Sequence, residues 1–158
     1  MYRSKGKTLL FLKLKKFRVP KTFLINANSY FKKKNFYIKK IIKNFGNKKI
    51  AIRSSSANED TEKTTNAGKF KSYLNISPNN RQDINEKIQG VIKSYKNKNN
   101  QNEVIIQTMI TNAVISGVCT TANIHNYLPI ITINYYRGSD TEVVTSGKKN
   151  SYSINIAD

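Results

Sequence analysis

Apolar residues recur at helical spacing in two long segments of the chain. Between residues 30 and 45 they form one side of a helix and lysines fill the other side, and Gly46 with Asn47 provides a typical helix end. A second helix is expected after Ser77 and Pro78, because a proline fits the first turn. A shorter lysine- and leucine-rich stretch, residues 7–16, predicts a first helix before the turn at Val19 and Pro20. The apolar side of the second helix consists of Ile84, Ile88, Val91, Ile92 and Tyr95.

Short β-branched runs predict strands, most of them in the last third of the chain. Residues 22–25 and 50–53 are the strands expected earlier, and the polar stretch 96–103 separates them from the strand-rich part. Because the later runs are short and divided by Asn, Gly or Ser turns, antiparallel pairing is expected. We therefore predict an α+β fold with mainly antiparallel sheet in two small lobes, residues 1–103 and 104–158. The later strands are predicted at 104–110, 117–121, 130–135, 142–145 and 152–156.

Composition sets limits on the class of protein. A chain of 158 residues with 38% hydrophobic residues can bury a core. The sequence has no apolar run near the roughly 20 residues of a spanning helix and no signal-like N-terminus, so a cytoplasmic protein without a membrane partner is expected. The single cysteine, Cys119, lies in an apolar strand and is expected to be a small buried thiol rather than a nucleophile, since no histidine motif accompanies it.

The net charge of +19 raises nucleic-acid binding as an alternative function. Residues 30–40 interleave aromatic side chains with lysines, as a single-strand binder would. The same apolar residues nevertheless fit one side of a helix, which leaves the lysines on its solvated side. The excess of Lys, Asn and Ile also runs through the whole chain, including segments without aromatics. Nucleic acid is therefore the less favoured partner.

The segment around Arg53 combines the residue types of an anion site. An apolar run ends on Arg53 and passes into the hydroxyl residues Ser54 and Ser55, and a turn containing Gly68 follows. An arginine at the end of a buried strand needs an anionic partner, and its planar fork suits a phosphate. The alternative partner is a nearby carboxylate, Glu59 or Asp60. The pattern indicates a phosphate site with Arg53 as its main cation.

Three ordered motifs resemble the nucleotide-binding domain of the phosphoenolpyruvate synthase and pyruvate phosphate dikinase family. Residues 50–60 read IAIRSSSANED and residues 66–75 read NAGKFKSYLN. Upstream, SKGKTLL at 4–10 precedes VPKTFLI at 19–25; downstream, VIIQTMI at 104–110 precedes SGVCTTAN at 116–123. The chain departs from the family pattern where phenylalanine or proline is expected, at Asn66, Thr120 and Ile124.

The resemblance implies an ATP-grasp fold, with ATP bound between two α+β lobes. Lys7 and Arg53 would contact the phosphates, Arg53 as the candidate catalytic residue, and Ser54, Ser55 and Gly68 would supply donors from a closing loop. Gln107 would lie beside the adenine, or else pair across the sheet.

The same resemblance implies a dikinase-like phosphotransferase, a kinase that moves phosphate from ATP through a phosphohistidine on a separate domain or partner chain. The acceptor would be a small molecule such as pyruvate or L-glutamine; residues 131–147 are similar to an L-glutamine kinase branch. His125 lacks the setting of a phosphohistidine. No residue here is assigned to metal, and Mg2+ is expected only with a segment beyond Asp158, so the chain alone is expected to be catalytically incomplete.

A comparison of two anions separates the nucleotide-binding hypothesis from simple charge attraction. Binding by charge alone falls steeply as salt rises from about 50 to 200 mM, whereas a nucleotide held in a cleft also gains adenine contacts. We expect ATP to bind more tightly than inorganic triphosphate at both salt concentrations, measured by calorimetry. Equal binding of the two anions, with salt removing both alike, would contradict an ATP pocket.

Overall fold

The computed structural model describes residues 4–56, 60–61, 64–65, 70–95, 101–122, 128–138, 142–145 and 151–156. Its contacts divide the chain into two compact units, Met1–Met109 and Ile110–Asp158. The mixed α and β composition and the antiparallel pairing within each sheet confirm the predicted α+β class.

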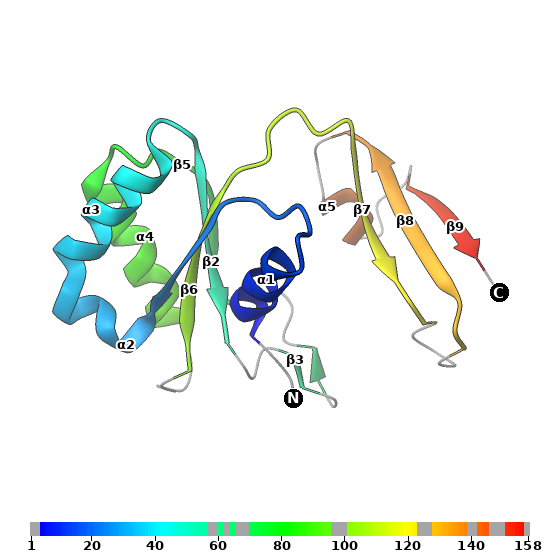
Figure 1. The fold of residues 1–158 in the computed structure, drawn as a ribbon, viewed down its shortest axis with the longest axis horizontal. Coiled ribbons are helices and arrows are strands. Elements are labelled where there is room, and N and C mark those ends of the chain that lie inside the picture. The colour runs from blue at the N-terminus through cyan, green and yellow to red at the C-terminus, as the bar shows by residue number, and fades with distance from the viewer. Residues whose placement is uncertain are drawn as a thin grey trace. The chain divides into compact units, whose positions relative to one another are not determined.

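Unit 1 is built on a four-stranded sheet in the order β1-β6-β2-β5 (Figure 1). Its strands are β1 (Thr22–Asn26), β2 (Ile50–Ser55), β5 (Ser72–Ile76) and β6 (Glu103–Thr108). The predicted boundary between residues 103 and 104 falls just after the first residue of β6, and β6 pairs with both β1 and β2 within the first unit. A short hairpin joins β3 (Asp60–Thr61) to β4 (Thr64–Thr65).

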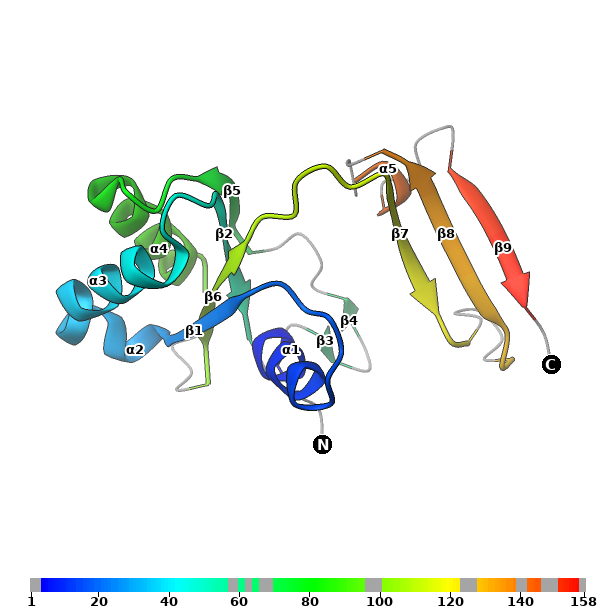
Figure 2. The same cartoon turned by 45° about the horizontal axis from the view of Figure 1, so that its top comes forward.

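Helices cover both faces of this sheet. Figures 1 and 2 show α3 (Lys34–Phe45) and α4 (Arg81–Ser94) on one face and α1 (Lys5–Leu14) on the other. The helix expected over 30–45 is divided: α2 (Ala27–Tyr30) is followed by the 3-10 turn Phe31–Lys33 and then by α3. Helix α3 ends at its C-cap Gly46, which confirms the expected end. The φ of Gly46 is 55°, a value that glycine tolerates because it has no Cβ.

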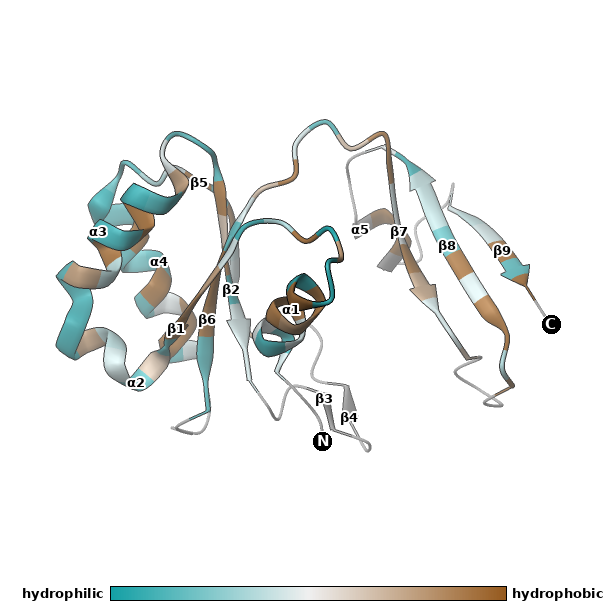
Figure 3. Cartoon of the chain, in the orientation of Figure 1, coloured by the Kyte–Doolittle hydropathy of each residue, from teal (hydrophilic) through white to brown (hydrophobic). Residues whose placement is uncertain are grey.

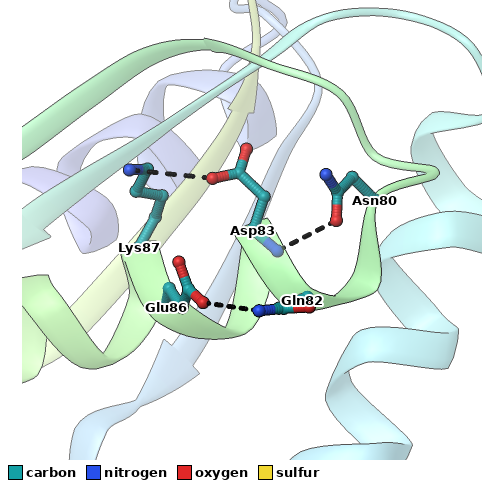
Figure 4. Close-up of polar contacts among 5 residues, drawn as sticks. All are labelled: Asn80, Gln82, Asp83, Glu86 and Lys87. Atoms are coloured by element: carbon teal, nitrogen blue, oxygen red, sulfur yellow. Dashed lines mark hydrogen bonds and ion pairs between the residues drawn. The ribbon is translucent and has the colours of Figure 1, made fainter.

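Helix α4 begins later than its proline suggested. Its N-cap is Asn80, whose side-chain oxygen accepts from the Asp83 backbone N–H at 3.0 Å (Figure 4). Asp83 also lies 3.7 Å from the Lys87 ammonium, one turn further along the helix. The cap satisfies one of the otherwise unpaired N–H groups of the first turn and places the helix start at Arg81.

The core of unit 1 lies between the sheet and the pair α3 and α4. Figure 3 shows the hydrophobic segments of both helices on the side of the strands. Tyr30 is the largest fully buried side chain, and its hydroxyl donates to the Asn85 side-chain oxygen at 3.1 Å. The remaining buried members of this core are Ile25, Ile38, Ile41, Phe45, Ile50, Ile52, Ile76, Ile84, Ile88, Val91, Val104 and Ile106.

Unit 2 contains a three-stranded antiparallel sheet in the order β7-β8-β9. Its strands are β7 (Ile115–Thr120), β8 (Ile131–Arg137) and β9 (Tyr152–Ile156). The strand predicted at 142–145 is wrong, since these residues form the short helix α5 (Glu142–Thr145). The two adjacent valines favour a strand, but this preference depends on context, and here the segment lies between β8 and β9 in the chain and does not enter the sheet.

The structure also bears on two other expectations, the burial of the cysteine and the absence of a membrane-spanning helix. Cys119 is exposed in β7, so the expectation of a buried thiol is wrong. Among the helices in the described ranges, none is both long enough and apolar enough to cross a bilayer.

Burial of Tyr30 makes a testable contribution to alkaline stability. Desolvation raises its pKa from 10.0 to about 12, so the unfolded chain loses this proton first and stability falls as pH rises from about 10 to 12. At pH 8 we expect Tyr30→Phe to lower the free energy of unfolding by about 1 kcal/mol, because the variant lacks the hydrogen bond to Asn85.

Near pH 11.5 the stability of the wild type relative to Tyr30→Phe should have fallen by about 2 kcal/mol, so that the variant becomes the more stable protein by about 1 kcal/mol, because phenylalanine does not titrate. Urea unfolding of both proteins at the two pH values measures this difference in the free energy of unfolding. A wild-type advantage that stays constant with pH would contradict a buried, desolvated Tyr30.

Candidate nucleotide site

Strand alternation divides the residues of β2 between the two faces of the sheet. Ile50 and Ile52 join the core beneath α3 and α4. Arg53 and Ser55 therefore lie on the opposite face, where α1 packs. We call this side the α1 face of the sheet.

Arg53 lies within a ladder but its side chain is exposed. It pairs with Ile105 of β6 on one side and Ser72 of β5 on the other. The expectation that it closes a buried strand is wrong, because β2 continues to Ser55 and the α1 face is open at Arg53. In the part of the chain that the structure describes, no carboxylate lies within ion-pair distance of Arg53.

Gln107 lies on the same face, diagonally across the ladder from Arg53. Arg53 is opposite Ile105, and Ala51 is opposite Gln107; such diagonal neighbours have Cβ atoms roughly 7 Å apart. The Gln107 side-chain amide donates to the Thr22 hydroxyl at 3.2 Å. The structure thus contains the cross-sheet pairing that was one of the two interpretations of Gln107.

A group of hydrogen bonds holds the start of α1 against the sheet. The Gly6 backbone N–H donates to the Ser55 hydroxyl at 2.9 Å, and the Ser4 hydroxyl donates to the Glu103 carboxylate at 2.7 Å. Ser4 is also the N-cap of the helix. A Cβ on Gly6 would lie 2.6 Å from a methyl group of Leu24, so only glycine fits this approach without a shift of its neighbours.

Ser55 is fully buried and is bonded within the fold. Its hydroxyl accepts from Gly6 and lies 3.5 Å from the Glu103 carboxylate, to which it donates. Its backbone N–H donates to the Tyr95 hydroxyl at 3.0 Å, and Tyr95 in turn donates to the Glu103 carbonyl. These bonds give Ser55 a part in joining α1, β2 and β6.

The other expected site residues are distributed as follows. Lys7 is exposed near the start of α1, and its backbone N–H donates to the Ser4 hydroxyl at 3.3 Å. Ser54 is buried and alternates onto the core face, so it does not join Arg53. Gly68, Glu59 and His125 lie outside the described residues, as does the side chain of Asp60.

Sequence reasoning missed the contribution of Ser4, Gly6 and Glu103. A signal was available for Ser4 and Gly6, since a serine before a helical stretch is a standard cap and a glycine early in a helix marks a close approach. Glu103 gave no local signal, because its partners are far away in the sequence.

The electrostatic surroundings of the α1 face favour anions. The first acidic residue of the whole chain is Glu59, so α1, α3 and β2 carry lysine or arginine without a carboxylate of their own. Exposed Lys5, Lys7 and Arg53 contribute to the positive charge on the α1 side. Glu103 is the carboxylate that the described contacts place on this side, bonded to Ser4 and Ser55, and the excess of cations over it favours the approach of an anion.

The fold, the exposed arginine and the positive surroundings are what a nucleotide-binding domain requires. Residues 32–157 match the family of the pyruvate phosphate dikinase AMP/ATP-binding domain. The chain belongs to this family. The match includes Arg53 and Gln107 and begins after Lys7. No curated protein matched the chain.

The bonds of Ser55 generate a prediction that separates a structural role from a ligand role. Ser55→Ala leaves the buried Gly6 N–H without its acceptor, so the free energy of unfolding should fall by about 1 to 3 kcal/mol. The matched control is Ser72→Ala on exposed β5, which should change stability by less than about 0.5 kcal/mol. Urea unfolding measures both. A Ser55→Ala protein with unchanged stability but weaker ATP binding would make Ser55 a ligand group instead.

Proposed function

We propose that the chain binds ATP on the α1 face of the unit 1 sheet, with Arg53 at the phosphates. The observation that carries the proposal is the position of Arg53 within the matched family region, exposed on an open sheet face. No described carboxylate pairs with the Arg53 guanidinium, and the planar fork of a guanidinium matches two phosphate oxygens.

Arg53 would neutralise and orient the phosphate that is transferred. Phosphoryl transfer depends mostly on positioning and charge neutralisation, so a cation fixed on a strand is suited to the task. Strand β2 is held on both sides, by β6 and β5, which limits backbone movement at Arg53. Lys7, on a helix bonded to the same strand through Gly6, would add a second and more mobile charge.

Gln107 would select the base. Its amide nitrogen donates to Thr22, and its carbonyl oxygen can accept from the exocyclic amine of adenine. Guanine presents a carbonyl at the corresponding position, which cannot donate to that oxygen. The same side chain thereby serves the sheet pairing and a preference for ATP over GTP.

The reaction we propose is the ATP-dependent half of a dikinase-type phosphotransfer of the kinase class. In this scheme the phosphoryl group passes to a histidine on another domain or chain and then to a small acceptor such as pyruvate or L-glutamine. Such a reaction on an ATP-grasp domain uses Mg2+, but among the described residues no three His, Cys, Asp or Glu side chains come together. We therefore assign no described residue to magnesium, and the role proposed for these residues is to bind and orient ATP.

Replacing Arg53 tests the phosphate assignment. Arg53→Ala should weaken ATP binding by about 1.5 to 3 kcal/mol, roughly 10- to 150-fold, the range for a hydrogen bond to a charged group. The control is Arg81→Ala, which removes the same charge from an exposed position on α4. This helix covers the core face of the sheet, opposite the α1 face. Calorimetry with ATP and with GTP measures both variants.

Two results would contradict this proposal. Equal losses in Arg53→Ala and Arg81→Ala would show that overall charge, and not the α1 face, holds the nucleotide. Wild-type affinity in a folded Arg53→Ala protein would exclude Arg53 from the phosphate contact.

A further inference from the structure

Helix α3 and the 3-10 turn before it present a lysine-rich surface to solvent. Every lysine of this segment has an exposed side chain, and the chain contains no acidic residue between residues 1 and 58. In the described ranges, no carboxylate forms an ion pair with any of these lysines. We call this the α3 lysine surface. Its members are Lys32, Lys33, Lys34, Lys39, Lys40 and Lys43.

Two phenylalanines of the same segment are exposed as well. Helical spacing predicts the aromatic side chains here, Phe31 among them, on the buried side, and Tyr30 is indeed buried. Phe31 is nevertheless 56% exposed, because the 3-10 turn interrupts the helical period at this point. Phe36 is 55% exposed, since it lies two residues before the buried Ile38 and so on the opposite side of α3. Rings and lysines therefore alternate on the surface of this segment.

Contacts with neighbouring rings hold the two exposed phenylalanines in place. Phe31 contacts Tyr30 edge-on with ring centroids 5.8 Å apart, and Phe36 contacts Tyr37 in the same way at 5.5 Å. Tyr30 and Tyr37 stack on each other at 6.1 Å, which joins both pairs into one row of rings. The Lys40 ammonium lies 5.4 Å from the centroid of Phe36, one turn further along α3. Phe36 is therefore held in a defined position beside a cation.

We propose that the α3 lysine surface binds single-stranded nucleic acid, with Phe31 and Phe36 as stacking platforms for its bases. A single strand alternates phosphates with unpaired bases. Lysines attract the phosphates, and an aromatic ring stacks on a base whatever its sequence. A surface that interleaves exposed rings with unpaired cations matches both parts of such a strand.

Other anionic partners fit this surface less well. A helix that lies in a membrane interface needs an apolar stripe to insert, but the apolar residues of α3, including Ile41 and Phe45, are buried in the core. Protein partners are disfavoured because lysine is depleted at protein interfaces, and here six lysines accompany two rings. A duplex would gain from the lysines alone, since its bases already stack on one another.

Fluorescence anisotropy with the full chain and labelled single strands of about 12 nucleotides, one RNA and one DNA, tests the proposal. Both should bind, because lysines and rings contact phosphates and base faces and not the 2′-hydroxyl. Phe36→Ala should weaken single-strand binding roughly 5- to 150-fold, and Phe36→Tyr, which keeps the ring, should retain it. Binding of a duplex should not respond to Phe36→Ala.

The matched control is Phe17→Ala. Phe17 is 63% exposed and lies between Lys16 and Arg18 in the sequence, but it follows α1 and is not part of the α3 lysine surface. Its replacement should leave single-strand binding unchanged. Circular dichroism checks that all variants are folded.

The salt dependence measures the contribution of the lysines. Each phosphate contact that is lost should reduce the slope of log affinity against log salt by about 0.7 for a single strand. Lys39→Gln combined with Lys43→Gln should therefore reduce the slope by about 1.4. The control is Lys15→Gln combined with Lys16→Gln, which removes the same charge from exposed positions after α1 and should leave the slope unchanged.

Four results would each overturn the proposal. These are no single-strand binding at about 50 mM salt, equal losses in Phe36→Ala and Phe17→Ala, equal slope changes in the two double variants, or tighter binding to phosphatidylserine vesicles than to single strands. The first would remove the partner, the next two would assign it to net charge alone, and the last would make the surface a membrane contact. ATP affinity should be unchanged in Phe36→Ala, because α3 and α1 cover opposite faces of the sheet, so the ATP proposal succeeds or fails separately.

Discussion

Strand β6 lies between β1 and β2, and the geometry of unit 1 depends on its insertion there. Val104, Ile105 and Ile106 are buried in succession, as expected for a strand covered on both faces. Since β6 comes long after its neighbours in the sequence, its pairing requires the chain to close a large loop. Once formed, that pairing places Glu103 beside Ser55 and Gln107 beside Thr22.

The docking of α1 is a consequence of this insertion. Glu103 at the start of β6 accepts from the helix cap Ser4, and Ser55 at the end of β2 accepts from Gly6. A carboxylate near the N-terminus of a helix is favourable, because the helix dipole is positive there. The same contacts direct the lysines of α1 and the guanidinium of Arg53 to one side of the sheet. The proposed ATP site and the fold therefore share their supports.

Local patterns predicted most elements, and long-range pairing explains the exceptions. The helices, the end of α3 at Gly46 and the antiparallel sheets followed from periodicity and turn residues, and the motif around Arg53 led to the correct family. The division of the long helix and the short helix α5 did not follow, since tertiary context overrides local propensity there. The start of α4 was missed for another reason, because its signal is the local Asn80 cap and not the proline at 78.

Which of the candidate residues share a face of the sheet could be predicted only in part, for the same reason. Arg53 and Gln107 were identified from their motifs, but their common face is fixed by the β2–β6 register, which the sequence does not display. Ser54 and Ser55 were grouped with them as hydroxyl donors, although strand alternation separates Ser54 from Arg53 and the contact with Gly6 occupies Ser55. Residue type suggested the chemistry, and register decided which residues meet.

Mapping the bound nucleotide by amide NMR tests the central claim most directly. Titration of 15N-labelled protein with ATP should shift the backbone amides of Gly6, Lys7 and Arg53, because α1 and β2 present the proposed site. Amides of α3 should remain nearly unchanged, because this helix packs on the opposite face of the sheet. Shifts concentrated on the lysine-rich surface of α3, with the α1 face unaffected, would contradict the account and make ATP a ligand of general positive charge.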